Sequence, residues 1–128
     1  MTEPFLFLNT YRLTPDADAE EYFRHGQEVV DLVYQNLPQM LHFGMYAEEG
    51  TGRVATVQVH AEPDNLAKHL QLVGPHIKAV APMLDWSSMQ LTCVGELSPT
   101  AEEMMRQMGV DDSSLTVFRR RVGFTRLT

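Results

Sequence analysis

Apolar residues recur at every second position in several short stretches of the chain, which is the period of a β-strand. The first stretch places Phe5, Phe7, Asn9 and Tyr11 on one face. Both of its faces begin apolar, so we expect a central strand that is covered on both sides. The sequence predicts strands over residues 5–13, 43–48, 53–61, 89–97 and 115–120, with 123–126 extending or re-pairing the last one.

Apolar residues three or four positions apart indicate helices between these strands. Asp18, with Glu21 three residues later, resembles a capping box and predicts the start of the first helix. Pro38 disfavours helical geometry in the residue before it, so this helix is expected to end near Asn36. Ser98, followed by a proline, predicts the start of the third helix.

The second helix opens near Pro63 and carries Leu66, Leu70 and Val73 on one stripe. Gly74-Pro75 follows directly, and proline is tolerated only in the first turn of a helix. We therefore expect an interruption at this point, with a shorter helical segment restarting at the proline.

The order of elements is β-α-β-β-α-β followed by α-β, which predicts an α+β protein with a ferredoxin-like antiparallel sheet. Residues 1–128 are expected to form one domain, with a core over 5–97 and a C-terminal helix and strand extension over 98–128. Helices cover one face of such a sheet. The other face would carry apolar residues of three strands, so the sequence predicts a homodimer that buries this face.

Composition supports one soluble domain and narrows the partners. The 128 residues are 44% hydrophobic and 21% charged, which argues against intrinsic disorder. The net charge of −7 opposes binding to phosphate backbones, so no nucleic-acid partner is expected. Residues 111–128 nevertheless carry four arginines and two aspartates. The arginine run Arg119–Arg121 is either solvated and salt-bridged or docks on an acidic neighbour, and this segment is a candidate to cross to the partner subunit.

Several kinds of chemistry find no support in the sequence. Cys93 is the single cysteine, and no Cys/His cluster has the spacing of a zinc site, so no metal is expected. The apolar run Phe5–Leu8 is too short for a signal sequence or a membrane span, which predicts a reduced, cytoplasmic protein without a membrane partner. No nucleophile elbow, phosphate loop or carboxylate pair is recognisable.

Two polar residues interrupt the apolar face of the first strand. Asn9 must be hydrogen-bonded if it is buried, either to a substrate oxygen or to a neighbouring backbone group. Tyr11 adds a phenol to the same face, as a substrate contact or as an amphipathic rim residue. Both are therefore candidate substrate-binding residues.

Three histidines and the tryptophan complete the candidate site. His69 and His76 are seven residues apart, which places them on one face of a continuous helix, and either is a candidate general base. The expected break at Gly74-Pro75 leaves this alignment open. His60 ends the third strand and is a candidate substrate contact, and Trp86 walls a pocket or seals the core. His25 and His42 look like surface or junction residues.

The element order and several local motifs resemble the antibiotic biosynthesis monooxygenase-like (ABM-type) family of dimeric α+β barrels. The matching stretches are Tyr11–Pro15, the acidic helix Glu20–Leu37, Leu66–Leu70 and Pro75–Val80. The resemblance covers about residues 5–97. It implies a homodimer that forms a dimeric α/β barrel. It also implies a pocket between the sheet and its helices, lined by aromatic and a few polar side chains.

The resemblance also implies an activity, because the family includes cofactor-independent oxygenases of quinol-like aromatic compounds. This chain would then be a monooxygenase acting on a hydroxylated aromatic or quinol-like small molecule. Asn9 and Tyr11 would orient the substrate oxygen, and His69 or His76 would be the base. Such an enzyme uses no cofactor: it needs a dry pocket, a base and a shield for the substrate carbanion while it reduces oxygen.

Two alternatives remain. The first is a non-catalytic small-molecule-binding or stress-associated dimer; a closed, methionine-filled core would favour it, and a cavity of roughly 300 Å³ or more would favour ligand binding. The second is haem binding or degradation. Asn9 matches the first-strand asparagine of the haem-degrading members, but His69 stands where they have tryptophan. Ala81 stands near their ligand position, with His76 about one turn earlier.

Overall fold

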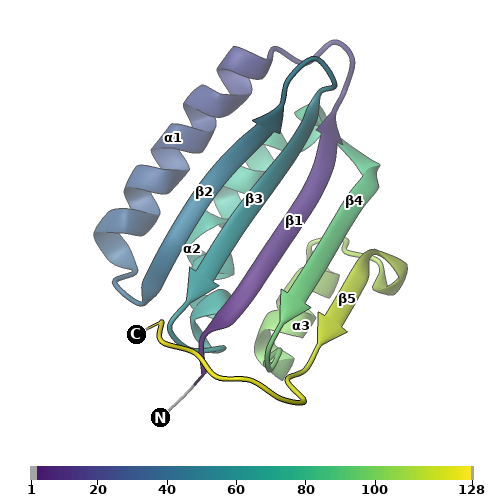
Figure 1. Cartoon of the computed structure of the whole chain (residues 1–128). Helices are drawn as coiled ribbons and strands as arrows, with labels where there is room; N and C mark the ends of the chain where they lie inside the picture. Colours follow the sequence, from purple (N-terminus) through teal and green to yellow (C-terminus); the bar gives the residue numbers. More distant parts are fainter. Residues whose placement is uncertain (1–2, 128) are drawn as a thin grey trace.

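A five-stranded sheet with helices on one face forms the molecule, as shown in Figure 1 by a computed structural model that describes residues 3–127. The strand order is β2-β3-β1-β4-β5. The first four strands pair antiparallel, and β5 pairs parallel to β4. The predicted α+β, ferredoxin-like sheet is confirmed.

The elements follow the predicted order, with some differences at their ends. Strand β2 begins earlier than expected, β4 begins five residues earlier, and β5 ends before the arginine run. Residues 123–126 form no strand, so the expected extension of β5 is wrong. The bounds are β1 Phe5–Leu13, α1 Ala19–Asn36, β2 Met40–Glu48, β3 Arg53–His60, α2 Asn65–Val80, η1 Ala81–Met83, β4 Leu84–Val94, α3 Pro99–Gln107, η2 Asp112–Ser114 and β5 Leu115–Phe118.

Helix α1 is capped as the sequence predicts. The Asp18 side chain accepts hydrogen bonds from the backbone N–H groups of Glu20 and Glu21, which would otherwise lack partners at the helix start. Gly26 lies where α1 crosses β2: a Cβ atom at this position would stand 2.6 Å from the sulfur of Met45. Glycine at this position therefore brings the helix close to the sheet.

Helix α2 is continuous from Asn65 to Val80, so the predicted break at Gly74-Pro75 is wrong. Proline removes one backbone hydrogen bond, to the carbonyl of the residue four positions earlier, which is Gln71. Both Pro75 and Gln71 lie on the exposed side of the helix, where water can satisfy that carbonyl. The opposite side of α2 packs on the sheet and holds the helix together across the proline.

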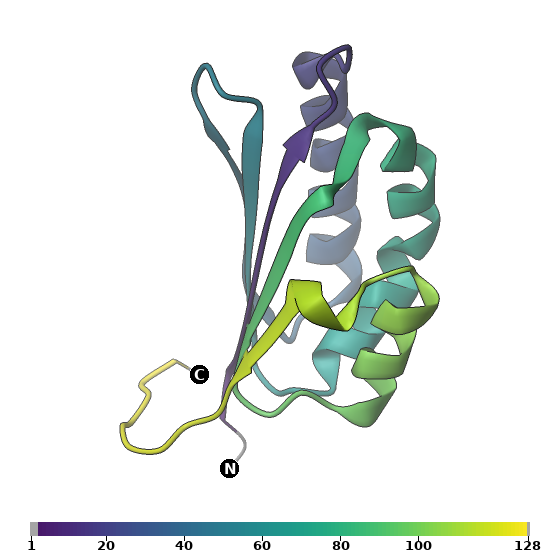
Figure 2. The same ribbon diagram turned by 90° about the vertical axis from the view of Figure 1, so that its right-hand side faces the viewer.

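Strand β1 alternates as predicted, but only one of its faces is covered by the chain itself. Phe5, Phe7 and Tyr11 are buried beneath the helices, whereas Leu6 and Leu8 on the other face are exposed. The expectation that this strand is covered on both sides is therefore not met within one subunit. Figure 2 shows all three helices on the same side of the sheet.

The C-terminal extension completes the core under the sheet. Ser98 caps α3 through a hydrogen bond from the N–H of Ala101. Ala101 and Met105 are buried against the sheet. Beyond β5, the chain leaves the sheet on the side away from the helices (Figure 2). This C-terminal tail, residues 119–127, carries Val122, Phe124 and Leu127 in exposed positions.

The uncovered face of the sheet, here called the open face, is apolar over its centre. Strand register places Leu6 beside Val59 and Val94, and Leu8 beside Val57. The side chains of Leu6, Leu8 and Val94 are 37%, 39% and 42% exposed. Phe118 of β5 extends this surface at the edge.

Candidate functional site

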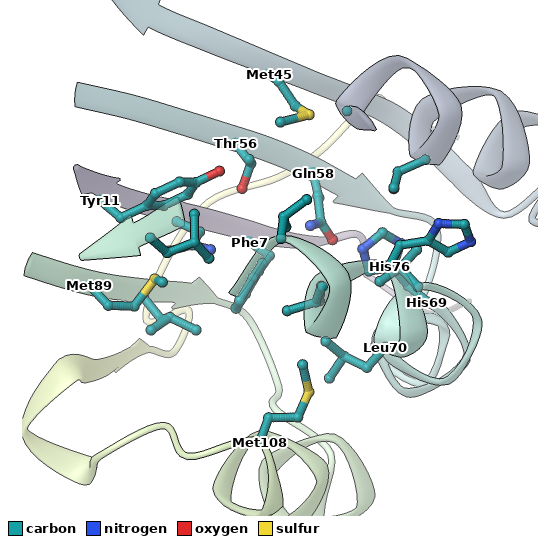
Figure 3. A pocket seen from close by; sticks show the side chains of 18 of the residues that line it. Phe7, Tyr11, Met45, Thr56, Gln58, His69, Leu70, His76, Met89 and Met108 are labelled. Carbon is teal, nitrogen blue, oxygen red and sulfur yellow. The ribbon is translucent and has the colours of Figure 1, made fainter. Parts of the chain in front are cut away.

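A partly open cavity of about 140 Å³ lies between the covered face of the sheet and helices α1, α2 and α3 (Figure 3). Its wall is mostly aromatic and aliphatic, and none of the residues that line it is Asp, Glu, Lys or Arg. An apolar cavity of about 150 Å³ holds one benzene ring. The enclosed space therefore accommodates one aromatic ring, and a ligand with fused rings would extend through the open side. The enclosed volume is smaller than the roughly 300 Å³ typical of pockets for larger ligands.

Asn9 and Thr56 form the polar floor of the cavity. They are direct neighbours on β1 and β3 because the strand register pairs them. The Oδ1 atom of Asn9 is buried and has no hydrogen-bond partner within residues 3–127. A buried acceptor without a partner costs about 1–3 kcal/mol, so this atom is a candidate contact for a bound ligand.

Tyr11 and Tyr22 join β1 to α1 at one end of the cavity. Their hydroxyl groups are hydrogen-bonded to each other. Burial raises the pKa of both phenols, so both are protonated at neutral pH. One of the two protons serves the mutual bond, and the second can be donated into the cavity.

His69 reaches the cavity from α2 and is buried. Its ring stands edge-on to Phe43 and to His60, with centroids 5.3 and 5.9 Å away. Burial, together with the neighbouring His60, lowers the pKa of His69 to about 3, so the ring is neutral at physiological pH. Its Nδ1 atom has no hydrogen-bond partner in the described part of the chain.

His76 lies two turns further along α2 and also lines the cavity (Figure 3). The continuity of the helix places His69, Val73, His76 and Val80 on one stripe that faces the sheet. The two candidate bases are therefore brought together, which the expected helix break had left open. His76 is only half-buried, so water can reach it.

His60 does not line the cavity, although the sequence made it a candidate substrate contact. It is fully buried at the end of β3, and burial lowers its pKa to about 4. Its two ring nitrogens are occupied by Gln58 and Asn65, each at 2.9 Å. It stands behind the cavity wall and supports Gln58.

Trp86 lies inside β4 rather than at the junction before it, and it lines the cavity. Its indole N–H donates to the carbonyl oxygen of Ala81 at 3.1 Å, and its side chain is 38% exposed. The tryptophan therefore forms part of the cavity rim rather than sealing a closed core.

The structure adds residues that the sequence interpretation passed over. Tyr22 and His25 face the cavity from α1, where the interpretation saw only an apolar stripe and a surface histidine. Thr56 and Gln58 face it from β3. The signal for the β3 pair was present, since both polar residues alternate in phase with the buried Val54.

Neither the cysteine nor a metal-binding cluster adds a second reactive site within residues 3–127. Burial raises the pKa of the Cys93 thiol to about 12, so the thiol is protonated and inert. Among residues 3–127, no three His, Cys, Asp or Glu side chains gather closely enough to hold a metal ion. None of the helices described has the length and apolar character needed to cross a membrane.

Comparison with solved structures identifies the fold as that of the antibiotic biosynthesis monooxygenase-like proteins, as the sequence resemblance predicted. MupZ from Pseudomonas fluorescens superimposes with a TM-score of 0.75 at 10% identity, over 98% of this chain and 96% of that one. A putative antibiotic biosynthesis monooxygenase from Caulobacter crescentus gives 0.66 at 16% identity, over 76% and 92% of the two chains.

SnoaB, a cofactor-independent oxygenase from Streptomyces nogalater, gives a TM-score of 0.61 at 12% identity, over 76% of this chain and 96% of that one. No protein-family model matches the sequence, and no curated protein matches it. At these identities the likeness establishes the fold. The match to MupZ covers nearly the whole chain and so includes the C-terminal extension, whereas the other two matches cover about three quarters of it.

Proposed function

We propose that the protein is a homodimeric, cofactor-independent oxygenase that binds a hydroxylated aromatic or quinol-like compound in the cavity beneath the sheet. The observation that carries this proposal is a pair of buried polar atoms in a mostly apolar cavity, Asn9 Oδ1 and His69 Nδ1, which have no hydrogen-bond partner within residues 3–127. Such atoms are costly unless a ligand satisfies them. The printed description of SnoaB as a cofactor-independent oxygenase supports the choice of reaction.

The cavity suits an uncharged aromatic ring with an oxygen substituent. Its walls supply aromatic and aliphatic contacts, and its polar groups are neutral hydroxyl, amide and imidazole groups. Asn9 and the Tyr11–Tyr22 pair would hold the substrate oxygen at the floor. His25, His76 and Trp86 also line the cavity, and His76 and Trp86 are accessible to water.

His76 is the stronger candidate for the base. A general base works best when its pKa lies near the operating pH, and the pKa of about 3 disfavours the protonated form of His69. His76 is half-buried, so it can pass an accepted proton to solvent. In this assignment His69 stays neutral and contacts the substrate.

The reaction balances without an added reductant. With an anthrone-like substrate, the base removes a proton to form a carbanion stabilised by the aromatic rings. The carbanion transfers electrons to O₂ and forms a peroxide at the same carbon. Loss of the second hydrogen and cleavage of the O–O bond give a ketone and one water, so carbon loses four electrons and O₂ gains four. The apolar walls keep water away from the carbanion.

Oxygen uptake with a hydroxy-substituted anthrone and with naphthol tests the activity. Replacement His76→Gln should lower the rate by about 100-fold or more, the usual contribution of a general base. Lys78→Gln, on the exposed side of the same helix, is the matched control and should leave the rate unchanged. Absence of uptake with any substrate would rule out the oxygenase, and an unchanged rate in His76→Gln would rule out this base.

A non-catalytic binding protein is the second candidate, and the small cavity with its strongly depressed His69 pKa favours it. It would use the same polar floor to hold the ligand without turnover. Calorimetric binding of naphthol without oxygen uptake would support this function over the oxygenase. A chain that neither binds nor oxidises these compounds would contradict both candidates.

The homodimer is proposed from the open face. Exposed leucine and valine side chains cover the centre of this sheet surface, and burying them is worth about 25 cal/mol per Å². A second copy offers the same apolar surface, related by a two-fold axis. Two sheets packed in this way would give the dimeric α/β barrel.

A further inference from the structure

Three buried polar side chains form a chain of hydrogen bonds behind the cavity wall. Asn65, at the start of α2, contacts Nδ1 of His60 through its Nδ2 atom at 2.9 Å. Nε2 of His60 contacts Oε1 of Gln58 at 2.9 Å. The three side chains are 1%, 0% and 5% exposed, so water does not compete for these bonds.

The chemistry of these groups determines which atom donates in each of the two hydrogen bonds. An amide NH₂ only donates, so Nδ1 of His60 must accept from Asn65. The proton of the neutral imidazole is then on Nε2, which donates to the carbonyl oxygen of Gln58. With its oxygen occupied, Gln58 has its NH₂ group left to offer, and Gln58 lines the cavity.

Gln58 supplies a hydrogen-bond donor to the cavity, and Asn9 supplies an acceptor. Strand register pairs Gln58 with Phe7 and Asn9 with Thr56, so the two amides lie on adjacent strands of the same face, one step apart. Figure 3 shows Gln58 extending from β3 into the space in front of the α2 histidines. Gln58 offers a donor, and Oδ1 of Asn9 is an acceptor without a partner.

We propose that Gln58 and Asn9 together select a ligand hydroxyl group, which accepts from the Gln58 NH₂ and donates to the Asn9 oxygen. His60 and Asn65 are positioning residues that hold the Gln58 amide in the orientation needed. This inference rests on the proposed function, since it concerns the same cavity, and it narrows the ligand class. A ketone or a methyl ether can accept the hydrogen bond from Gln58. It has no proton to donate, so it leaves the Asn9 oxygen unpaired.

Naphthol and its methyl ether test the selection, because the ether carries a methyl group in place of the hydroxyl proton and cannot donate a hydrogen bond. Fluorescence titration of the full-length protein should show naphthol binding about tenfold or more tighter than the ether. Asn9→Leu should remove this preference. Gln58→Met should weaken the binding of both ligands by a similar factor and preserve the preference for naphthol. Equal affinity of the two ligands for the native protein overturns the selection, while the cavity remains a binding site.

Failure to bind either ligand would overturn the proposed function together with this inference. The two failures are therefore distinguishable from the same titrations. Melting curves of both variants show whether each is folded before it is titrated.

The positioning role of His60 has its own test. His60→Phe alone should weaken the binding of both ligands severalfold. Added to Gln58→Met, it should weaken binding no further, because its effect passes through the Gln58 amide. NMR of the imidazole nitrogens in the native protein should place the His60 proton on Nε2, a measurement that does not depend on the variant folding. A proton on Nδ1, or additive effects of the two substitutions, would contradict the proposed direction.

Discussion

The two faces of the sheet are both incomplete in a single subunit, but in opposite ways. The covered face mixes apolar and polar side chains, and one of its buried atoms, Asn9 Oδ1, has no hydrogen-bond partner within residues 3–127. The open face is partly exposed to water, yet it carries Leu6, Leu8 and Val94. One face therefore has a polar atom that lacks a hydrogen-bond partner, and the other lacks apolar cover.

This difference indicates what each face binds. Two or three polar atoms at the base of a small cavity are satisfied by a small molecule with matching groups. A broad apolar surface is satisfied by another broad apolar surface, which a second subunit would supply. Alternation along β1 places both requirements in one strand, since Leu8 and Asn9 are consecutive residues on opposite faces.

The largest effect is expected from a charge on the open face. Leu8→Asp places a carboxylate at the centre of the proposed interface. Because both subunits carry the substitution, the interface would contain two such charges. Breaking an interface with an unpaired buried charge costs about 3–5 kcal/mol, so association should weaken by more than about 100-fold. Sedimentation velocity across a concentration series measures the change.

Tyr34→Asp is the matched control for this substitution. Tyr34 is 86% exposed on α1, away from the open face, and its replacement should leave association unchanged. A native protein that sediments as a monomer at ordinary concentrations would contradict the dimer itself.

Acid should lower the free energy of unfolding through the two histidines buried on the covered side of the sheet. The pKa of His60 is lowered to about 4 and that of His69 to about 3 by burial, against 6.5 in the unfolded chain. Below about pH 6.5 the unfolded chain binds protons that the folded chain does not, so the free energy of unfolding falls as the pH falls towards 4. Each imidazole contributes on the order of 3 kcal/mol over this window.

Urea unfolding between pH 7 and pH 4 measures this slope. His69→Phe, which keeps a ring against Phe43 and removes the titrating group, should flatten the curve relative to the native protein. Parallel curves for the two proteins would show that His69 is not the source of the acid sensitivity. Above pH 6.5 the histidine contribution to both curves should be level.

Much of this fold was predictable because local signals agreed with the packing. The cap at Asp18 and the alternation of β1 and β3 are features of a few residues, and the structure keeps them. The break at Gly74-Pro75 was predicted by the same local rules and is wrong. Tertiary packing of the opposite side of α2 and an exposed Gln71 carbonyl make the proline tolerable, and neither is a local signal.

The candidate site was only partly accessible to sequence interpretation. Asn9 and Tyr11 were recognisable because they interrupt an apolar face, and both line the cavity. Tyr22 was not recognised as a site residue, since its bond to Tyr11 joins elements distant in sequence. His60 looked like a cavity residue from its strand position, but its bonds to Gln58 and Asn65 depend on the turn into α2.

A smaller effect is expected at the floor of the cavity. Asn9→Leu replaces a buried acceptor without a partner by an apolar side chain of similar size. The free energy of unfolding of the unliganded protein should rise by about 1–2 kcal/mol, since the cost of the unsatisfied oxygen disappears. Chemical denaturation measures the gain, and a destabilised variant would show that Asn9 is already satisfied without a ligand.

The smallest effect is expected from the C-terminal tail. Arg119 and Arg120, at the start of this tail, form ion pairs with Glu96 and Glu3, with N···O distances of 3.7 and 2.7 Å. The tail lies on the same side of the sheet as the open face (Figure 2), and its residues Val122 and Phe124 are 91% and 77% exposed. We expect these side chains to contact the partner subunit at the edge of the interface, where each contact is weak.

Deleting residues 119–128 tests this expectation while keeping β5, whose Leu115 and Val117 pack against the core. Dimer dissociation should become about tenfold easier, corresponding to about 1.4 kcal/mol, and naphthol binding in the cavity should not change. Because the open face remains intact, the truncated chain should still associate far more tightly than Leu8→Asp. If it associates as tightly as the full chain, the tail belongs to its own subunit alone, and the open face by itself accounts for the dimer.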